Sequence, residues 1–138
     1  MNSRKLSILL AVVMLFVSTL ACAFGNTDPV LDNVRTARDQ DGEQPATIFS
    51  TFDTVYVVSD LRNGKLGDIV TSNWYVGNAQ GWEPNSLLDS AEINVNEDPF
   101  NGTVYFYFPP GNGWSVGTYK VEVLYNGTLI NTVNFTVQ

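Results

Sequence analysis

The chain contains no histidine and a single cysteine among its 138 residues. Without histidine there is no Ser-His or Cys-His nucleophile pair, no histidine-ligated metal ion and no imidazole for general acid–base catalysis. A lone cysteine also excludes a disulfide bond within the chain. These absences predict a protein that is not an enzyme and that holds neither a cofactor nor a metal ion.

Basic residues are scarce as well, with 7 Lys and Arg against 14 Asp and Glu. Two of the basic residues, Arg4 and Lys5, belong to an N-terminal segment that has the features of an export signal. The rest of the chain therefore carries 5 basic and 14 acidic side chains, a formal charge of −9. Nucleic acids and anionic membrane surfaces are bound by clustered Lys and Arg. The composition therefore argues against both as partners.

Residues 1–21 are organised like a signal peptide, with Arg4 and Lys5 ahead of an uncharged run of 15 residues from Leu6 to Leu20. As a helix this run would span roughly 22 Å, which is less than the roughly 30 Å hydrocarbon core of a bilayer. We therefore expect the segment to direct export and not to remain as a transmembrane helix.

The only cysteine, Cys22, comes directly after the apolar run, and residues 19–22 (TLAC) resemble a bacterial lipobox, in which the cysteine is lipidated and becomes the new N-terminus. Two or three acyl chains anchor a protein stably, because each buried CH₂ group contributes roughly 0.8 kcal/mol. The favoured prediction is a lipoprotein of the cell envelope whose only membrane contact is this lipid, with a tether over residues 22–29. In the alternative, residues 21–23 (ACA) fit the A-x-A rule of ordinary signal peptidase, and the protein is soluble and secreted.

Hydrophobic residues recur with a period of two along most of the remaining chain, in short runs separated by Gly, Pro, Asn and Asp. This pattern indicates β-strands, and no amphipathic helix is evident. Seven short strands with turn signals between them favour an all-β fold, an antiparallel β-sandwich, over a closed barrel. The expected strands cover residues 33–38, 53–61, 68–76, 86–95, 103–108, 118–125 and 129–137.

Asn126-Gly127 lies between the last two alternating runs. This dipeptide is the strongest short-range signal for a β-hairpin, because a type I′ turn needs a positive φ at both central residues. We therefore expect the last two strands to be antiparallel neighbours.

The C-terminal half has a familiar motif: Trp74-Tyr75, then residues 113–123 (GWSVGTYKVEV), the Asn126-Gly127 turn and residues 135–137 (FTV). It resembles the Ig-like domain of many exported bacterial proteins, in which W-x-x-G-x-Y-x-V-x-V is followed by a turn and F-x-V. The resemblance covers residues 30–138. It implies an Ig-like accessory domain, often found on lipoproteins, with no catalytic residues to carry over.

Several aromatic residues fall on the strand faces that should point into the sandwich. Trp74 is expected at a core position of the third strand, and Trp114 is expected to close one end of the sandwich. The residues predicted to form the structural core are Trp74, Tyr119, Phe106 and Phe135.

The acidic segment 39–43 (DQDGE) looks at first like a calcium-binding loop. In an EF-hand the glycine stands sixth and a bidentate glutamate twelfth, whereas here Gly42 is fourth and the twelfth position is Ser50. The match fails, and a solvated acidic turn is the favoured interpretation.

Exposed aromatic side chains are the only features that suggest a binding surface. The candidate set is Trp82, Tyr75, Tyr105 and Tyr107, which could stack on sugar rings. For the last two, simple cross-strand pairing on an outer face is the favoured explanation.

The sequence thus predicts a non-enzymatic, exported Ig-like module that supports protein–protein or envelope interactions. The alternative is a carbohydrate-binding module that uses the exposed aromatics. The identity of the partner, whether a protein, another envelope component or a glycan, does not follow from the sequence.

Overall fold

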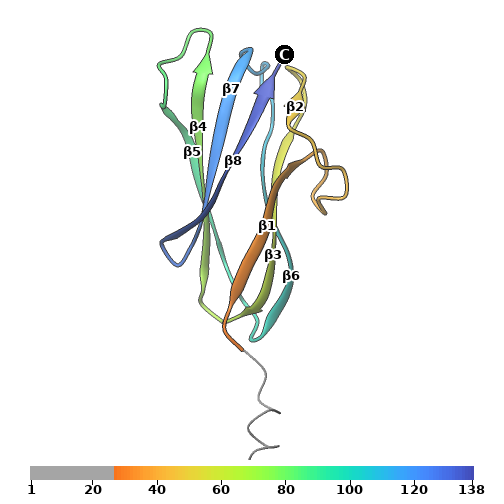
Figure 1. The fold of residues 1–138 in the computed structure, drawn as a ribbon, viewed down its shortest axis with the longest axis vertical. Coiled ribbons are helices and arrows are strands. Elements are labelled where there is room, and N and C mark those ends of the chain that lie inside the picture. Colours follow the sequence, from red (N-terminus) through yellow and green to blue (C-terminus); the bar gives the residue numbers. More distant parts are fainter. Residues whose placement is uncertain (1–26) are drawn as a thin grey trace, which may run out of the picture.

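A computed structural model describes residues 27–138, which form a sandwich of two β-sheets (Figure 1). The predicted signal peptide, Cys22 and most of the predicted tether lie outside the described residues. Within them, no helix is long and apolar enough to cross a membrane. The strands are β1 (Val30–Ala37), β2 (Ile48–Phe49), β3 (Val55–Gly64), β4 (Ile69–Ala79), β5 (Leu87–Asn94), β6 (Phe100–Phe108), β7 (Gly117–Tyr125) and β8 (Thr128–Val137).

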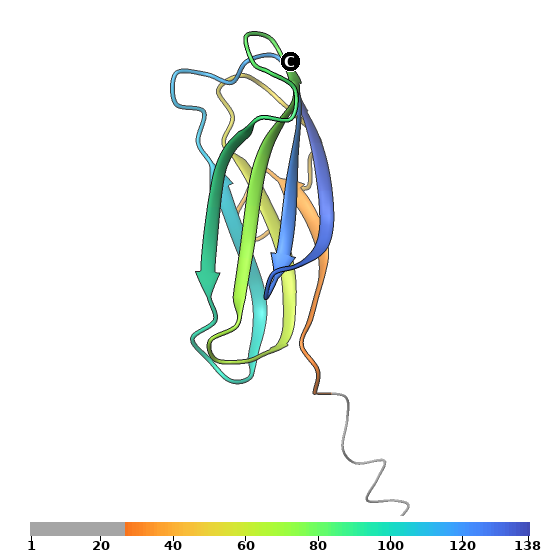
Figure 2. The ribbon, with the colours of Figure 1, turned by 90° about the vertical axis from the view of Figure 1, so that its left-hand side faces the viewer.

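One sheet has three strands in the order β1-β3-β6, and the other has five in the order β2-β8-β7-β4-β5. Figure 2 shows the five-stranded sheet from its outer side, with β5 at one edge. All the pairs are antiparallel except β2 and β8, which run parallel. The prediction of an all-β, Ig-like sandwich is confirmed.

Two details differ from the sequence-based expectation of seven antiparallel strands. The eighth strand, β2, pairs only Ile48 with Thr136 and Phe49 with Val137, and this pairing is parallel. A strand of two residues is too short to show a period of two, so the pattern could not have revealed it. Between β1 and β2 the chain leaves the three-stranded sheet and joins the five-stranded one.

The core lies between the sheets and is formed by the side chains that alternate inward along each strand. Valines of β3 and β4 face each other across it, and the aromatic side chains gather toward one end. Trp114 contacts both Phe108 and Phe135, with ring centroids 4.9 and 5.5 Å apart. The residues predicted to form the core, Trp74, Tyr119, Phe106 and Phe135, are all buried, and so is Trp114.

The turn between β7 and β8 has the predicted geometry. Asn126 and Gly127 have φ values of 48° and 81°, and the flanking residues Tyr125 and Thr128 are paired. Positive φ at both central residues is the signature of a type I′ turn. The Asn126 side chain also accepts a hydrogen bond from the backbone N–H of Ile69 at 2.8 Å, which ties this turn to the start of β4.

Gly117 stands where β7 begins, against the end of β4, and no larger residue fits there. A Cβ atom at this position would lie 2.3 Å from the carbonyl oxygen of Asn78 and 2.5 Å from the Cα of Ala79. Both are backbone atoms, so relief requires moving a strand. The glycine of the Ig-like motif is therefore required by the close approach of two backbones.

We expect Gly117→Ala to lower the free energy of unfolding by about 1–3 kcal/mol, because the overpacked strands must separate. Gly102→Ala is the control: its Cβ would meet only the ring of Phe100, at 3.3 Å, on an exposed strand. That change should alter stability by about 0.5 kcal/mol or less. Equal denaturant midpoints for the two variants would contradict the packing of β4 against β7.

Candidate binding surface

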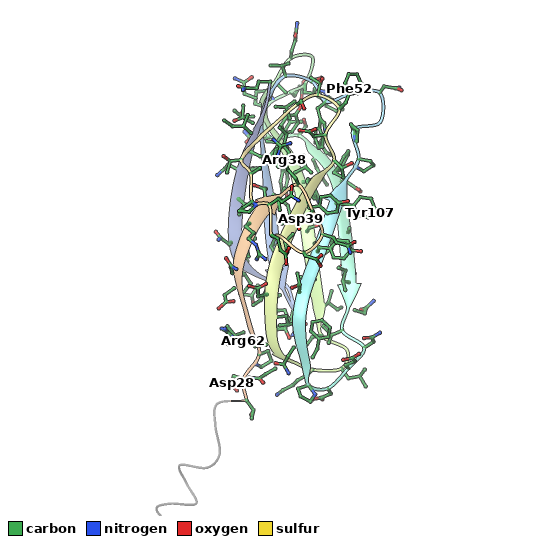
Figure 3. All side chains as sticks on the ribbon, turned by 90° about the vertical axis from the view of Figure 1, so that its right-hand side faces the viewer. Asp28, Arg38, Asp39, Phe52, Arg62 and Tyr107 are labelled. Carbon is green, nitrogen blue, oxygen red and sulfur yellow. The ribbon has the colours of Figure 1, made fainter. Side chains whose placement is uncertain are left out.

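Two of the four predicted binding aromatics lie together on the outer face of the three-stranded sheet. Tyr105 and Tyr107 alternate outward along β6 and are 38% and 60% exposed. Their rings lie beside the ring of Tyr56 on β3, at centroid distances of 6.3 and 6.0 Å. Figure 3 shows this face, with Tyr107 on β6. We call Tyr56, Tyr105 and Tyr107 the tyrosine cluster.

Tyr56 belongs to this surface but is not among the aromatic residues predicted to form it. The signal that could have found it is the register, because Tyr56 is the cross-strand partner of Tyr107. Paired residues in a sheet share a face. The pairing of β3 with β6 is a long-range contact, and the sequence pattern gave no turn that joins these two strands.

The other two predicted residues are elsewhere. Tyr75 lies on β4 in the five-stranded sheet, where the Lys120 ammonium sits 5.2 Å from its ring centroid. Trp82 lies in the connection between β4 and β5 at one end of the sandwich, and its indole N–H donates to the Ser115 hydroxyl at 3.3 Å. The four predicted aromatics therefore do not form one patch.

Beside the tyrosine cluster a groove of about 480 Å³ runs between β5 and β6. Each of these strands is the last in its sheet, so the two sheets end here side by side, and no strand of residues 27–138 lies between them. The floor includes Trp74. The walls are formed by Asp89, Ala91, Glu92 and Ile93 from β5, and by Phe100 and residues 103–107 from β6.

The charge of the groove is negative. Asp89 and Glu92 are the acidic residues that line it, and no basic residue is among them. Of the two, Asp89 shares the inner face of β5 with Ala91 and Ile93, whereas Glu92 alternates to the outer face. All nine residues of β6 are uncharged. Long uncharged edge strands are uncommon, because a free strand edge that carries no charge invites pairing with another chain.

The acidic segment 39–43 forms a structural loop, as the interpretation of it as an acidic turn implies. The Asp39 carboxylate accepts hydrogen bonds from the backbone N–H groups of Gln44 (2.9 Å) and Glu43 (3.0 Å), and these bonds hold the pKa of Asp39 below its usual value. Arg35 donates to the carbonyl oxygens of Gly42 and Asp41, which draws the loop onto β1.

Two further carboxylates serve the fold in the same way. The backbone N–H of Ser50 and the Arg38 guanidinium, which is 2.6 Å away, keep the pKa of Asp53 low. Burial acts to raise the pKa of Asp68, but hydrogen bonds from the Tyr125 hydroxyl and the Asn126 amide outweigh it, and the pKa is lowered. Such carboxylates stay ionised at neutral pH and act as hydrogen-bond acceptors. Among residues 27–138 no group of three or more potential metal ligands is gathered.

At the end of the sandwich, Tyr119 makes the contact known as a tyrosine corner. Its hydroxyl donates to the backbone carbonyl of Ser115 at 2.6 Å, four residues upstream. This corner is a hallmark of Ig-like sandwiches. A small hollow of about 220 Å³ next to it is lined mainly by apolar residues, including Trp82, Leu88 and Trp114.

Comparison with solved structures places this architecture among Ig-like folds. An immunoglobulin-like protein from Pseudomonas aeruginosa matches with a TM-score of 0.54 and 15% sequence identity, over 80% of this chain and 97% of that one. The alkylpurine DNA glycosylase of Pseudomonas fluorescens, solved with DNA containing an abasic site analogue, has a TM-score of 0.50 and 8% identity, over 80% of this chain and 30% of the enzyme. A β-glucosidase of Listeria innocua, solved with laminaribiose, has a TM-score of 0.50 and 12% identity, over 83% of this chain and 17% of the enzyme.

This chain therefore spans less than a third of the length of either enzyme. The likeness to the immunoglobulin-like protein covers nearly all of that chain and shows that the fold is Ig-like. At such low identities the likeness shows the fold alone. No protein-family model and no curated protein sequence matches the chain.

Proposed function

We propose that this chain is an exported, non-enzymatic Ig-like module that is held at the cell envelope by a lipid on Cys22 and binds a protein or other envelope component through β6. The observation that supports this proposal best is the surface along β6. There the tyrosine cluster, an apolar groove and a free strand edge adjoin one another. Tyrosine is the kind of side chain that is enriched in binding surfaces, since its ring offers contact area and its hydroxyl a hydrogen bond.

A carbohydrate is the second candidate ligand, and the tyrosine cluster is the observation that favours it. Aromatic rings stack on the apolar faces of sugars, and three such rings adjoin here. The ring of Tyr56 is inclined by 52° to Tyr105 and by 36° to Tyr107. Rings inclined in this way do not form the flat platform that stacks on a straight glycan chain. We therefore rank a protein partner above a glycan.

The lipid anchor is tested on the mature protein. We expect its N-terminal residue to be Cys22 with acyl chains attached, as measured by mass spectrometry, and Cys22→Ser to move the protein from the membrane fraction to the soluble one. Asn26→Ser, four residues further on, is the control and should leave the protein in the membrane fraction. A mature N-terminus at Phe24 without a lipid would show soluble secretion instead.

The binding role is tested separately by cross-linking from Tyr105 in intact cells, with Tyr75 on the opposite sheet as the control position. Because this measurement does not require the lipid, failure of the anchor and failure of the binding surface give different results.

A further inference from the structure

We infer that the groove between β5 and β6 receives an extended segment of a partner protein, which pairs with the free edge of β6 as an added strand and places a basic side chain against Asp89. This inference rests on the proposed binding role of β6 and names the kind of partner. Addition of a strand to a free sheet edge is a general mode of peptide recognition, in which main-chain hydrogen bonds give affinity and alternate side chains give specificity.

Both walls of the groove are strand edges. β6 has β3 on one side and, among residues 27–138, no strand on the other; β5 has only β4. A free edge presents a row of backbone N–H and C=O groups to solvent. The nine residues of β6 extend over about 30 Å, at roughly 3.3 Å for each residue. This length is enough for a segment of several residues.

The inner face of β5 is incompletely covered. Ile93 is paired with Val70 and Ala91 with Ser72, and paired residues share a face. Val70 and Ser72 are fully buried on this inner face, whereas Ile93 and Ala91 are only half-buried. The reason is that the three-stranded sheet ends at β6 and has no strand opposite β5. A strand added to β6 would lie over Ala91 and Ile93 and bury them.

The groove also carries a negative charge. The Asp89 side chain shares the inner face of β5 with Ala91 and Ile93, and the β6 strand opposite carries no charge. Asp89 is the partner of Trp74 in the pairing of β4 with β5, so it stands over the floor of the groove. The occupant that fits is a strand with apolar side chains toward Ala91 and Ile93 and a Lys or Arg toward Asp89. A second copy of this chain fits poorly, because its own β6 carries no basic side chain to place against Asp89.

The test uses residues 27–138, which contain both sheets and the whole buried core. The probe is the capped peptide Thr-Val-Thr-Val-Thr-Lys-Thr, together with its versions in which Val is replaced by Ile or Phe and a version in which Glu replaces Lys. Binding is measured by titration calorimetry, and the position of binding by amide hydrogen exchange. We expect the Lys peptides to bind and to protect amides in residues 103–107.

Asp89→Lys should weaken binding of the Lys peptides by roughly tenfold or more, because like charges at an interface repel. The same variant should bind the Glu peptide more tightly than the native protein does, because opposite charges attract. Glu83→Lys makes the same change of net charge at an exposed position in the connection between β4 and β5, outside the groove, and should leave both affinities unchanged. Unchanged melting temperatures of both variants would show that the fold is retained.

Four results would overturn the inference. Three come from the peptide experiments: no binding by any of the Lys peptides, equal binding to the native protein and to Asp89→Lys, or protection outside β5 and β6. The fourth is self-association of the free protein with the β6 amides already protected, which would make a second copy of the chain the occupant of the groove. If cross-linking from Tyr105 succeeds while the peptides fail, the proposed function stands and the added strand does not.

Discussion

Replacing Trp74 with alanine is expected to lower the free energy of unfolding by about 3–5 kcal/mol, the range found for removal of large buried aromatic side chains. Trp74 is only 2% exposed and lies on β4, between β7 and the edge strand β5 of the five-stranded sheet. Its ring contacts Phe108 and Phe135, at centroid distances of 5.6 and 6.2 Å. With the ring gone, the inward side chains of both sheets lose a common contact and a cavity remains.

Trp74→Ala would also remove a buried hydrogen bond, which lowers the free energy of unfolding further. The indole N–H of Trp74 donates a hydrogen bond to the hydroxyl of Ser72 at 3.0 Å, and Ser72 is completely buried. Alanine would leave this hydroxyl in the core without its donor, and a buried polar group without a partner is destabilising. Trp74→Phe with Ser72→Ala is the variant that separates the two costs, because it keeps an aromatic ring and removes both polar groups.

The control for size and residue type is Trp82→Ala. Trp82 is half exposed, and its indole N–H donates a hydrogen bond to the half-buried Ser115. We expect its loss to cost far less than the loss of Trp74, as measured by the denaturant midpoint of residues 27–138. Similar denaturant midpoints for the two alanine variants would contradict the placement of Trp74 in the core.

The strands and the core were predictable because they depend on neighbouring residues. The alternation of residues 103–108 predicts both the strand and the side chains that point inward. Asn126-Gly127 predicts the hairpin, because a type I′ turn requires a positive φ at both central residues. Trp74 and Tyr119 could be placed in the core for the same reason. Local patterns of this kind are visible in a single sequence.

The binding surface was predictable only in part, because it depends on which strands lie at the edges of the sheets. Alternation put Tyr75 on an outer face as it did Tyr105, but it could not show that the two faces belong to opposite sheets. The contribution of Tyr56 and the groove beside Asp89 both follow from pairings between strands distant in sequence. The two-residue strand β2 was missed because its pairing with β8 is set by the folded sandwich and not by its own residues.

The acidic segment 39–43 has a structural role in the fold. Its composition suggests a calcium-binding loop, but the positions of its glycine and of the twelfth residue do not match an EF-hand. In the fold the Asp39 carboxylate is occupied by two backbone N–H groups of its own loop, and Arg35 holds the same loop from β1. The acidic side chain that faces the groove, Asp89, lies on β5, in the other sheet from β1.

The central claim is that the β6 side of the sandwich is the face that meets a partner, and photo-cross-linking in intact cells tests it most directly. A photoreactive phenylalanine analogue would replace Tyr105 in the full-length chain, and Tyr75 on the outer face of the opposite sheet in a second variant. Both residues are partly exposed aromatics, so the substitution is closely matched. The account predicts a discrete cross-linked adduct from position 105, with little or none from position 75. An adduct from position 75 with none from position 105 would contradict it.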